Sequence, residues 1–392
     1  MKIVYIVTRA DHFGGAQIHI RDMSKWMTEK GHDVTVIGGW TGILSDQIKE
    51  NGVKFRIASQ LFRSIHPIKD LTAFFQVRSI LKDIKPDIVS CHSSKAGMIG
   101  RMAAWSLGIK SIFTAHGWAF TEGIHPLKAL MFRWIEWFCA FFGDHIITVS
   151  RYDKILALKH GVAKSKNMTV VHNGKPNRPY IKNRDFNDTP QLCMVARFSD
   201  QKDHTTLLNA LGALKDKKWH LNLVGDGEDN DYRALAIALD IQNKVTFHGQ
   251  RHDVPDFLDT QDIYLLISHW EGFPRSIVEA MRAGLPVITT RTAGAPEAVE
   301  QFRTGYVVPE RTPKTLERAI NILISDPLRC QTMGEVGRRR YEKNFTFEKM
   351  AYKTLNVYEN VLDLEPSEHP LSQVDVRPAS KTIESVHRTG TI

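Results

Sequence analysis

The stretch SHWEGFPRSIVEAMRAGLPVITT, Ser268–Thr290, holds the pattern that decides the fold. The apolar run IYLLIS leads into it and the apolar run LPVITT ends it, and each run has the length of a buried strand. Between the two runs, Pro274 suits the first turn of a helix, because the N–H that proline lacks would be unpaired there. Strand, turn, helix and strand in this order form the repeating unit of a parallel α/β sheet.

The same unit recurs on both sides of this stretch. The first half of the chain contains the apolar runs MKIVYIVT, HDVTVIGG, PDIVSCHS, KSIFTAHG, DHIITVS and MTVVHNG, and the second contains QLCMVARF, HLNLVGDG, KVTFHGQ, DIYLLISH, LPVITT and GYVVP. Most are continuous rather than alternating, which is typical of strands buried on both faces of a parallel sheet. We therefore predict an α/β protein with two Rossmann-like, doubly wound domains that face each other across a cleft, where ligands bind beyond the carboxyl ends of the strands.

The length of 392 residues favours two domains of roughly 170 residues each. We expect a first domain at residues 1–175 and a second at 191–345, joined by a linker at 176–190 that is rich in proline, asparagine and charge. A helical pattern at 346–363 is expected to pack back towards the first domain. Residues 364–392 lack periodicity and are expected to form a disordered tail.

Composition restricts the class of protein. The four cysteines lie far apart without metal-ligand spacing, so we read them as free thiols in a reducing compartment. No run of about 18 uninterrupted apolar residues exists, and the first strand is too short for a signal peptide, which favours a cytoplasmic protein. The net charge of +9 favours anionic partners, but no nucleic-acid-binding motif is present and we expect no nucleic acid partner.

Two glutamates bracket the turn in the opening stretch. Glu271 lies at the carboxyl end of a strand, and Glu279 lies inside the helix that follows. The start of that helix attracts phosphate, so the two carboxylates could hold hydroxyl groups on either side of it. A nucleotide-sugar has this layout of ribose, diphosphate and sugar. The alternative is that Glu271 is a solvated loop charge and Glu279 an ordinary helix residue.

The whole string resembles the signature of retaining glycosyltransferases of the GT-B fold, family GT4. The resemblance extends over about Lys2–Leu362 and implies that Glu271 contacts the donor sugar and Glu279 holds the ribose. The backbone between them also binds the donor in that family, at the positions of Gly272, Phe273 and Pro274.

Arg275 departs from many family members, which carry smaller residues there. It either tunes donor choice or points into solvent. Similar strings with Pro-Arg-Ser occur among polysaccharide-building members, which favours bacterial surface polysaccharide synthesis.

A second motif, VARFSDQKD, opens the second domain. It places Arg197 and Lys202 at the exit of a strand, where two cations can neutralise a diphosphate and the charge that builds on a leaving group. The alternative is two surface cations. The resemblance supports the first interpretation, because GT4 proteins carry a matching Arg-x4-Lys.

Two further candidates lie in the first domain. Gly14 and Gly15, in DHFGGAQIH, join the first strand to the first helix and allow close backbone approach to an anion, or form a plain tight turn. His116, in TAHGW, ends a strand, and GT4 members place a functional histidine similarly. We expect this imidazole to be neutral and to hydrogen-bond the donor sugar.

The acidic segment VGDGEDNDY contains Asp226, Glu228, Asp229 and Asp231 and could suggest a metal site. It lies between a strand and a helix, so turn and N-cap roles account for the acids. GT4 proteins do not normally require metal, and we expect neither a metal nor another cofactor.

The segment Ile124–His145 is rich in Trp and Phe and also carries Lys128 and Arg133. It reads either as an amphipathic helix at a membrane interface or as a core helix that covers the sheet. Enzymes of this type often extend polyprenyl-linked sugars on the inner face of the bacterial membrane, so we expect peripheral association with an anionic membrane surface.

The sequence thus predicts a retaining glycosyltransferase that moves a sugar from a nucleoside-diphosphate-sugar to a glycan or polyprenyl-linked acceptor. His116, Arg197, Lys202 and Glu271 are the predicted catalytic residues. Two alternatives stay open: a sugar-nucleotide epimerase of the same fold, and a non-catalytic nucleotide-binding partner subunit. A nicotinamide enzyme would need the glycine fingerprint that this chain lacks.

Overall fold

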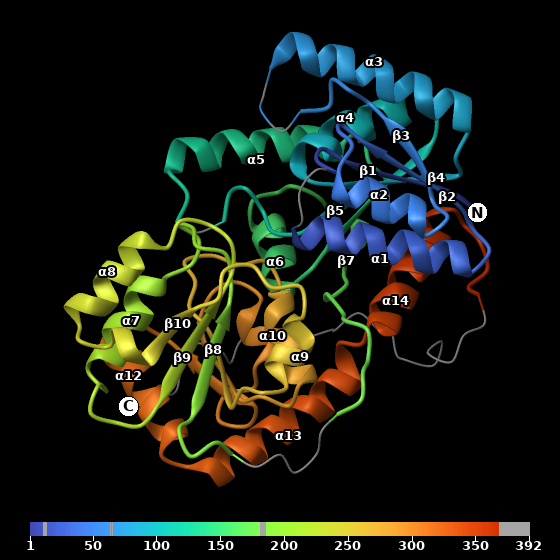
Figure 1. Cartoon of the computed structure of the whole chain (residues 1–392). Helices are drawn as coiled ribbons and strands as arrows, with labels where there is room; N and C mark the ends of the chain where they lie inside the picture. The colour runs from blue at the N-terminus through green and yellow to red at the C-terminus, as the bar shows by residue number, and fades with distance from the viewer. Residues whose placement is uncertain (11–13, 63, 65, 122, 181–185, 368–392) are drawn as a thin grey trace.

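A computed structural model describes residues 1–10, 14–62, 64, 66–121, 123–180 and 186–367. The described part forms two lobes, each built on its own parallel sheet (Figure 1). The predicted tail at 364–392 lies outside the described residues from position 368 onward, and part of the predicted linker lies outside them at 181–185.

The first sheet has seven parallel strands in the order β3-β2-β1-β4-β5-β6-β7. The strands are β1 (Lys2–Val7), β2 (Asp33–Gly38), β3 (Lys54–Ile57), β4 (Ile88–His92), β5 (Lys110–Ala115), β6 (His145–Thr148) and β7 (Met168–Val170). Its helices are α1 (Gly15–Glu29), α2 (Ile43–Glu50), α3 (Pro67–Ile84), α4 (Ser94–Trp105), α5 (Pro126–Ala140) and α6 (Arg151–Lys159). The sequence patterns predicted every strand but β3, an edge strand whose side chains are mostly exposed and which therefore lacks a continuous apolar run.

The second sheet has six parallel strands in the order β10-β9-β8-β11-β12-β13. They are β8 (Gln191–Val195), β9 (His220–Val224), β10 (Val245–Phe247), β11 (Ile263–Leu266), β12 (Val287–Thr290) and β13 (Gly305–Val308). The helices are α7 (His204–Gly212), α8 (Asn230–Ala238), α9 (Val254–Leu258), α10 (Arg275–Arg282), α11 (Ala295–Ala298), α12 (Pro313–Ile324) and α13 (Pro327–Asn344). The predicted strand-turn-helix-strand unit is thus β11, α10 and β12, with Pro274 at the N-cap of α10.

The last helix, α14 (Phe347–Val361), returns from the second lobe and lies beside the first sheet (Figure 1). Its apolar side chains, among them Leu355 and Tyr358, share one buried cluster with β1 and α1. Burying a side chain of this size is worth roughly 1.5–3 kcal/mol. The C-terminal helix therefore contributes to the core of the first lobe.

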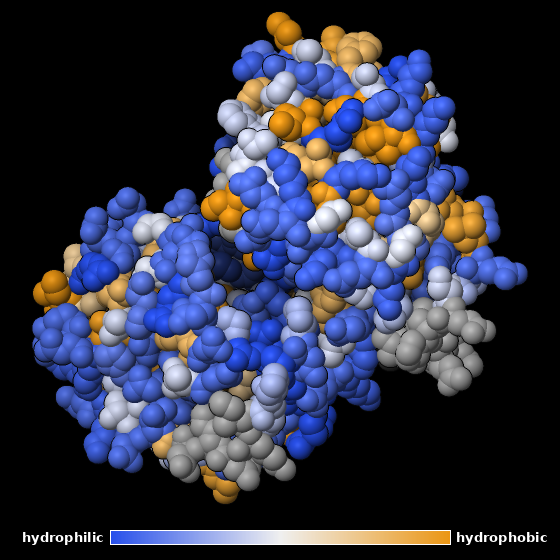
Figure 2. Space-filling model, turned by 45° about the vertical axis from the view of Figure 1, so that its right-hand side comes forward, coloured by the Kyte–Doolittle hydropathy of each residue, from blue (hydrophilic) through white to orange (hydrophobic). Residues whose placement is uncertain are grey.

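The chain crosses between the lobes twice at one place. Lys175 on the first crossing pairs with Thr346 on the second, and the Lys175 amide donates to the Phe345 carbonyl at 3.1 Å. Gly174 fits this contact because a Cβ there would lie 2.4 Å from the Thr346 carbonyl oxygen. A deep hollow separates the lobes on the face shown in Figure 2.

No helix among the described residues is long and apolar enough to cross a membrane.

Candidate active site

The candidate residues gather where the strand order of each sheet reverses. In the first sheet this point lies between β1 and β4, and in the second between β8 and β11. Gly14 and Gly15 follow β1, Arg197 and Lys202 follow β8, and Glu271 follows β11. Ligands of doubly wound sheets bind at such points, beyond the carboxyl ends of the strands.

Glu271 is held by the loop that follows β8. The Lys202 ammonium makes an ion pair with its carboxylate, and both side chains are mostly buried. Gln201 donates to the Trp270 carbonyl at 2.8 Å and so fixes the same loop. Two residues that the sequence placed 69 positions apart thus form one charged pair, and Glu271 is not a solvated loop charge.

The loop after Glu271 touches the first lobe through its backbone. A Cβ at Gly272 would lie 2.3 Å from the His116 carbonyl oxygen, and the Gly294 amide donates to the Gly272 carbonyl at 2.8 Å. Only glycine fits such a close approach of two backbones. His116 and the Gly272 turn, which belong to different lobes, are therefore direct neighbours.

Glu279 also has a lysine partner, and the sequence did not predict it. The Lys175 ammonium makes an ion pair with the Glu279 carboxylate, and both groups are largely buried. Burial opposes the charge on Glu279, but Lys175 and Arg275 outweigh burial and hold the pKa of this carboxyl below its ordinary value. Lys175 stands at the crossing between the lobes, directly after the His172–Gly174 segment, which the sequence indicates is a structural turn.

Arg197 lies further towards solvent than Lys202. Its Nε is 3.2 Å from Asp226 Oδ1, and both side chains are nearly half exposed. In the same acidic segment, Asp229 stands at the N-cap of α8 but pairs with Arg233 at 2.9 Å and makes no capping hydrogen bond. The predicted capping role is therefore wrong for Asp229, because the nearby guanidinium competes for its carboxylate.

The glycine pair begins α1. Gly14 is the N-cap of this helix and Gly15 its first residue, and no side chain caps the helix. The other residues of the predicted motif, 11–13, lie outside the described residues. The start of α1 thus presents amide groups near the carboxyl end of β1.

His116 belongs to a buried hydrogen-bonded chain. Tyr358 of α14 donates to Ser90 Oγ at 2.8 Å, Ser90 Oγ lies 3.0 Å from His92 Nε2, and His92 Nδ1 lies 3.0 Å from His116 Nε2. Burial lowers the pKa of His92 well below its ordinary value and, with Arg275, lowers that of His116 to about 3, so both rings are neutral.

The tautomer of His116 is coupled to the direction in which this chain donates. When Ser90 donates to His92 Nε2, the single proton of His92 sits on Nδ1 and is donated to His116 Nε2. His116 then carries its own proton on Nδ1. In either tautomer the Nε2 atom of His116 is occupied by His92, and Nδ1 is the nitrogen left for a ligand.

A third histidine, His19 of α1, completes the cluster. Nitrogen atoms of His19, His92 and His116 lie within 4.8 Å of one another, a spacing at which imidazoles could hold a metal ion. Two of these nitrogens already share a hydrogen bond, and the Arg275 cation lies close enough to lower the pKa of His19 and His116. Neither feature favours a dication there. The sequence did not predict His19 or His92 as part of the site, because each is a lone histidine until the sheet brings them together.

Further contacts fix the two lobes against each other. Asn173 donates to the Phe273 carbonyl at 2.9 Å, and His172 Nε2 lies 2.7 Å from Glu297 of α11. The same Glu297 accepts the Arg151 and Tyr152 amides at the start of α6 at 2.9 and 2.8 Å. These contacts surround the Gly272 turn.

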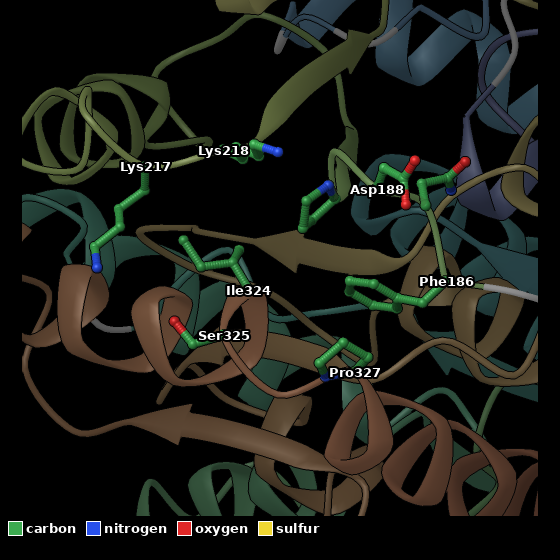
Figure 3. Close-up of a pocket in the computed structure, with 9 residues that line it drawn as sticks. Phe186, Asp188, Lys217, Lys218, Ile324, Ser325 and Pro327 are labelled. Atoms are coloured by element: carbon green, nitrogen blue, oxygen red, sulfur yellow. The ribbon is translucent and has the colours of Figure 1, made fainter.

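A pocket of about 430 Å³ lies elsewhere on the second lobe (Figure 3). Its lining includes Pro190, Lys218 and Pro327, which lie near the amino ends of β8 and β9 and between α12 and α13. This is the edge of the sheet opposite to Glu271 and Lys202. We therefore place the candidate active site between the lobes and not in this pocket.

Comparisons with known proteins agree with this architecture. The family model described as Glycosyltransferase Family 4 matches residues 13–175, and the model described as Glycosyl transferases group 1 matches residues 179–340. Together they match both lobes.

Relatives match over most of the chain. The Escherichia coli UDP-Gal:alpha-D-GlcNAc-diphosphoundecaprenol alpha-1,3-galactosyltransferase is 26% identical over 83% of this chain and 88% of its own length. The putative glycosyltransferase EpsD of Bacillus subtilis is 25% identical over 94% of this chain and 98% of its own length.

Among solved structures, Anabaena Alr3699/HepE in complex with UDP and glucose superposes with a TM-score of 0.78 at 20% identity, over 92% of this chain and 100% of that chain. A glycosyltransferase from Rickettsia africae superposes with the same TM-score at 21% identity, over 93% of this chain and 99% of that chain. The fold is therefore GT-B.

Proposed function

The chain belongs to the family 4 glycosyltransferases, and we propose that it transfers a sugar, with retained anomeric configuration, from a nucleoside-diphosphate-sugar to a glycan or polyprenyl-linked acceptor in bacterial surface polysaccharide synthesis. The observation that supports this most is the pair of lysine-bound carboxylates, Glu271 and Glu279, on either side of the start of α10. The relative from E. coli is named for a UDP-sugar and a diphosphoundecaprenol acceptor, so UDP is the first nucleotide to test.

The contacts suggest how each group would act. The free amides at the start of α10 would bind the diphosphate, and Lys202 and Arg197 would offset the charge on the leaving group. Glu279 would bind the ribose hydroxyls, and Glu271 the donor sugar. Each carboxylate makes an ion pair with a lysine, and a charged carboxylate is a strong acceptor for hydroxyl groups.

His116 is suited to donate to the sugar and not to act as a base. It is neutral and its Nε2 is occupied by His92, so in the tautomer with the proton on Nδ1 it can donate to a sugar hydroxyl. We therefore propose that an oxygen of the leaving phosphate takes the proton of the acceptor hydroxyl. The bond from the anomeric carbon to that phosphate breaks as the bond to the acceptor oxygen forms on the same face.

The experiment follows nucleotide release from UDP-sugars with and without a prenyl-diphosphate-linked acceptor sugar. We expect release that depends on acceptor, persists in EDTA, and yields a product with the anomeric configuration of the donor by NMR. An inverted product would contradict the same-face mechanism. Conversion of the donor without acceptor would favour an epimerase, and nucleotide binding without any turnover would favour a non-catalytic subunit.

We further propose that α5 binds an anionic membrane surface. Seven large apolar side chains on and just after this helix are at least 41% exposed: Leu127, Leu130, Met131, Trp134, Trp137, Phe138 and Phe141. The one acid of the helix, Glu136, is buried and paired with Arg101 at 2.8 Å, so the exposed face carries Lys128 without an acid. Tryptophans and a lysine on an apolar face are typical of helices that lie in an interface.

The membrane proposal is tested by sedimentation with vesicles of phosphatidylglycerol or phosphatidylcholine. We expect binding to the anionic vesicles only, and a loss of at least about tenfold in the double variant Trp134→Ser, Trp137→Ser. Leu328→Ser is the control, because Leu328 is 72% exposed on α13 of the other lobe. Equal binding by the double variant and the control would overturn the role of α5.

A further inference from the structure

Arg275 does not point into solvent but is buried between the lobes. Its side chain is 11% exposed, and its Nε, Nη1 and Nη2 atoms are all buried without a hydrogen-bond acceptor among the described residues. The nearest acid is Asp22 of α1, whose Oδ2 lies 3.5 Å from Nη2. A guanidinium has five N–H donors, so a buried one without acceptors is unusual.

The acids around Arg275 already have other partners. Arg21 donates from Nε and Nη2 to Asp22 Oδ1 at 2.8 and 2.7 Å, and Lys175 is paired with Glu279. Three cations therefore share two carboxylates, and Arg275 is the cation with the poorest contact. An incompletely paired buried charge destabilises a folded protein, so the position calls for a further anion.

The other groups that face Arg275 are donors or neutral. A Cβ placed on Gly15 would lie 3.5 Å from Cδ of Arg275, so the Arg275 side chain lies against the start of α1. Arg275 is itself the first residue of α10. Neither helix has an acid in its first turn or a side-chain cap. Both helix starts, which carry the positive end of the helix dipole, therefore meet at this cation.

His19 adds a second unpaired donor or acceptor at the same place. It is 4% exposed, and its Nδ1 has no hydrogen-bond partner among the described residues. Arg275 lies close enough to His19 to lower its pKa further, after burial and the neighbouring histidines. A neutral imidazole beside a guanidinium can donate to an anion without adding a charge.

We propose that Arg275 and His19 form an oxyanion subsite, on the first-lobe side of the cleft, that binds a phosphate group. This inference rests on the proposed function for the source of the phosphate: it is either the donor diphosphate or the diphosphate that links an acceptor sugar to its lipid. The planar guanidinium of arginine is well suited to phosphate, because it can donate two parallel hydrogen bonds to two phosphate oxygens. The subsite is distinct from the pair formed by Lys202 and Glu271.

The competing explanation is that Arg275 only ties α10 to Asp22. The two explanations predict opposite effects on the ligand-free protein. If Arg275 is a structural tie, Arg275→Gln lowers the thermal midpoint by at least about 3 °C. If it is a ligand site, removing an incompletely paired buried charge leaves the midpoint unchanged or raises it.

The experiment measures binding by calorimetry for the wild type, Arg275→Gln, Arg275→Lys and the control Arg318→Gln, which replaces an exposed arginine on α12. The probes are UDP, uridine, and inorganic pyrophosphate added in the presence of excess UDP. Weaker UDP binding in Arg275→Gln, by at least about tenfold and with uridine unchanged, assigns the subsite to the donor. Unchanged UDP binding with pyrophosphate weakened by the same factor assigns it to the acceptor.

Equal binding of all three probes by Arg275→Gln and the control overturns the subsite, and so does a lowered thermal midpoint without ligand. Arg275→Lys keeps the charge but loses the planar guanidinium, and we expect intermediate affinity. This variant replaces Arg275→Gln if the latter does not fold.

The subsite proposal and the donor proposal can fail separately. If the wild type binds UDP and Arg275→Gln equals it for every probe, the subsite fails alone. If the wild type binds pyrophosphate through Arg275 but binds no nucleotide, the donor proposal fails alone.

Discussion

At the scale of single residues, the site is built from charged pairs that join distant parts of the chain. Lys202 reaches Glu271 and Lys175 reaches Glu279, so each predicted carboxylate already has a cation in the absence of ligand. Lys175 helps to hold the pKa of Glu279 below its ordinary value, and both lysines lie beside the turn that precedes α10 or the helix itself. This arrangement is prepared for an anion and for hydroxyl groups together.

The role of Lys202 leads to the first prediction. Lys202→Met removes the charge but keeps most of the apolar stem, so donor turnover should fall by roughly 10²–10³-fold, the usual effect of losing one group that stabilises a leaving charge. The measurement is kcat at saturating donor, with Lys217→Met as the control because Lys217 is exposed near the amino end of β9. A fall of less than threefold would show that Lys202 serves only to hold Glu271.

The buried histidines lead to a prediction on pH. His116 has a pKa of about 3 in the folded protein, because of burial and Arg275, against about 6.5 in an unfolded chain. Above pH 6.5 both states are neutral, and as the pH falls below 6.5 only the unfolded state gains the proton. Stability is therefore lost between about pH 6.5 and pH 3, by about 1.4 kcal/mol per pH unit for each such histidine.

The check is the free energy of unfolding in urea between pH 7 and pH 4.5 for the wild type and His116→Gln. The variant should show a shallower loss of stability on acidification, because glutamine cannot titrate. Parallel pH profiles for the two proteins would contradict a neutral His116.

At the scale of elements, the approach of the Gly272 turn to the His116 loop decides how the lobes meet. Gly272→Ala would place a methyl group 2.3 Å from a backbone carbonyl oxygen, which cannot move as a side chain can. We expect a loss of about 1–3 kcal/mol in unfolding free energy and a larger loss of activity. Gly212→Ala is the matched control, because its methyl group meets only the Leu239 side chain, at 3.1 Å. Similar stability of the two variants in urea unfolding would refute the close contact.

The sequence predicted the elements better than the contacts. Continuous apolar runs marked the strands of both sheets because a strand buried on both faces must be apolar throughout. The edge strand β3 is not predicted from the sequence, because its mostly exposed side chains do not form a continuous apolar run.

Contacts between elements left no pattern along the chain. The sequence does not predict Lys175 as the partner of Glu279, because the two residues lie far apart in the chain. It does not predict His19 and His92 beside His116 either, because the three histidines come from different helices, strands and loops that only the fold brings together. The sequence alone does not decide whether Arg275 tunes donor choice or points into solvent, because only the packing of α1 against α10 shows that its side chain is largely buried.

At the scale of the whole molecule, two parallel-sheet lobes lie on either side of one hollow (Figure 2). The starts of α1 and α10 face this region, and α14 ties the first lobe to the chain that leaves the second. The molecule is thus arranged to hold an extended anionic ligand between the lobes.

The most direct test of this account is the binding of UDP, GDP, ADP and NAD to the wild type, Glu279→Ala and Glu29→Ala, measured by calorimetry on protein whose folding is confirmed by thermal melting. Glu29 is 59% exposed at the end of α1 and serves as the control. The account predicts that the wild type binds one nucleoside diphosphate and that only Glu279→Ala weakens it, by about 10-fold or more, as expected for lost hydrogen bonds to a charged group. Folded wild-type protein that binds none of the four, or a Glu279→Ala variant that binds as tightly as the control, would contradict it.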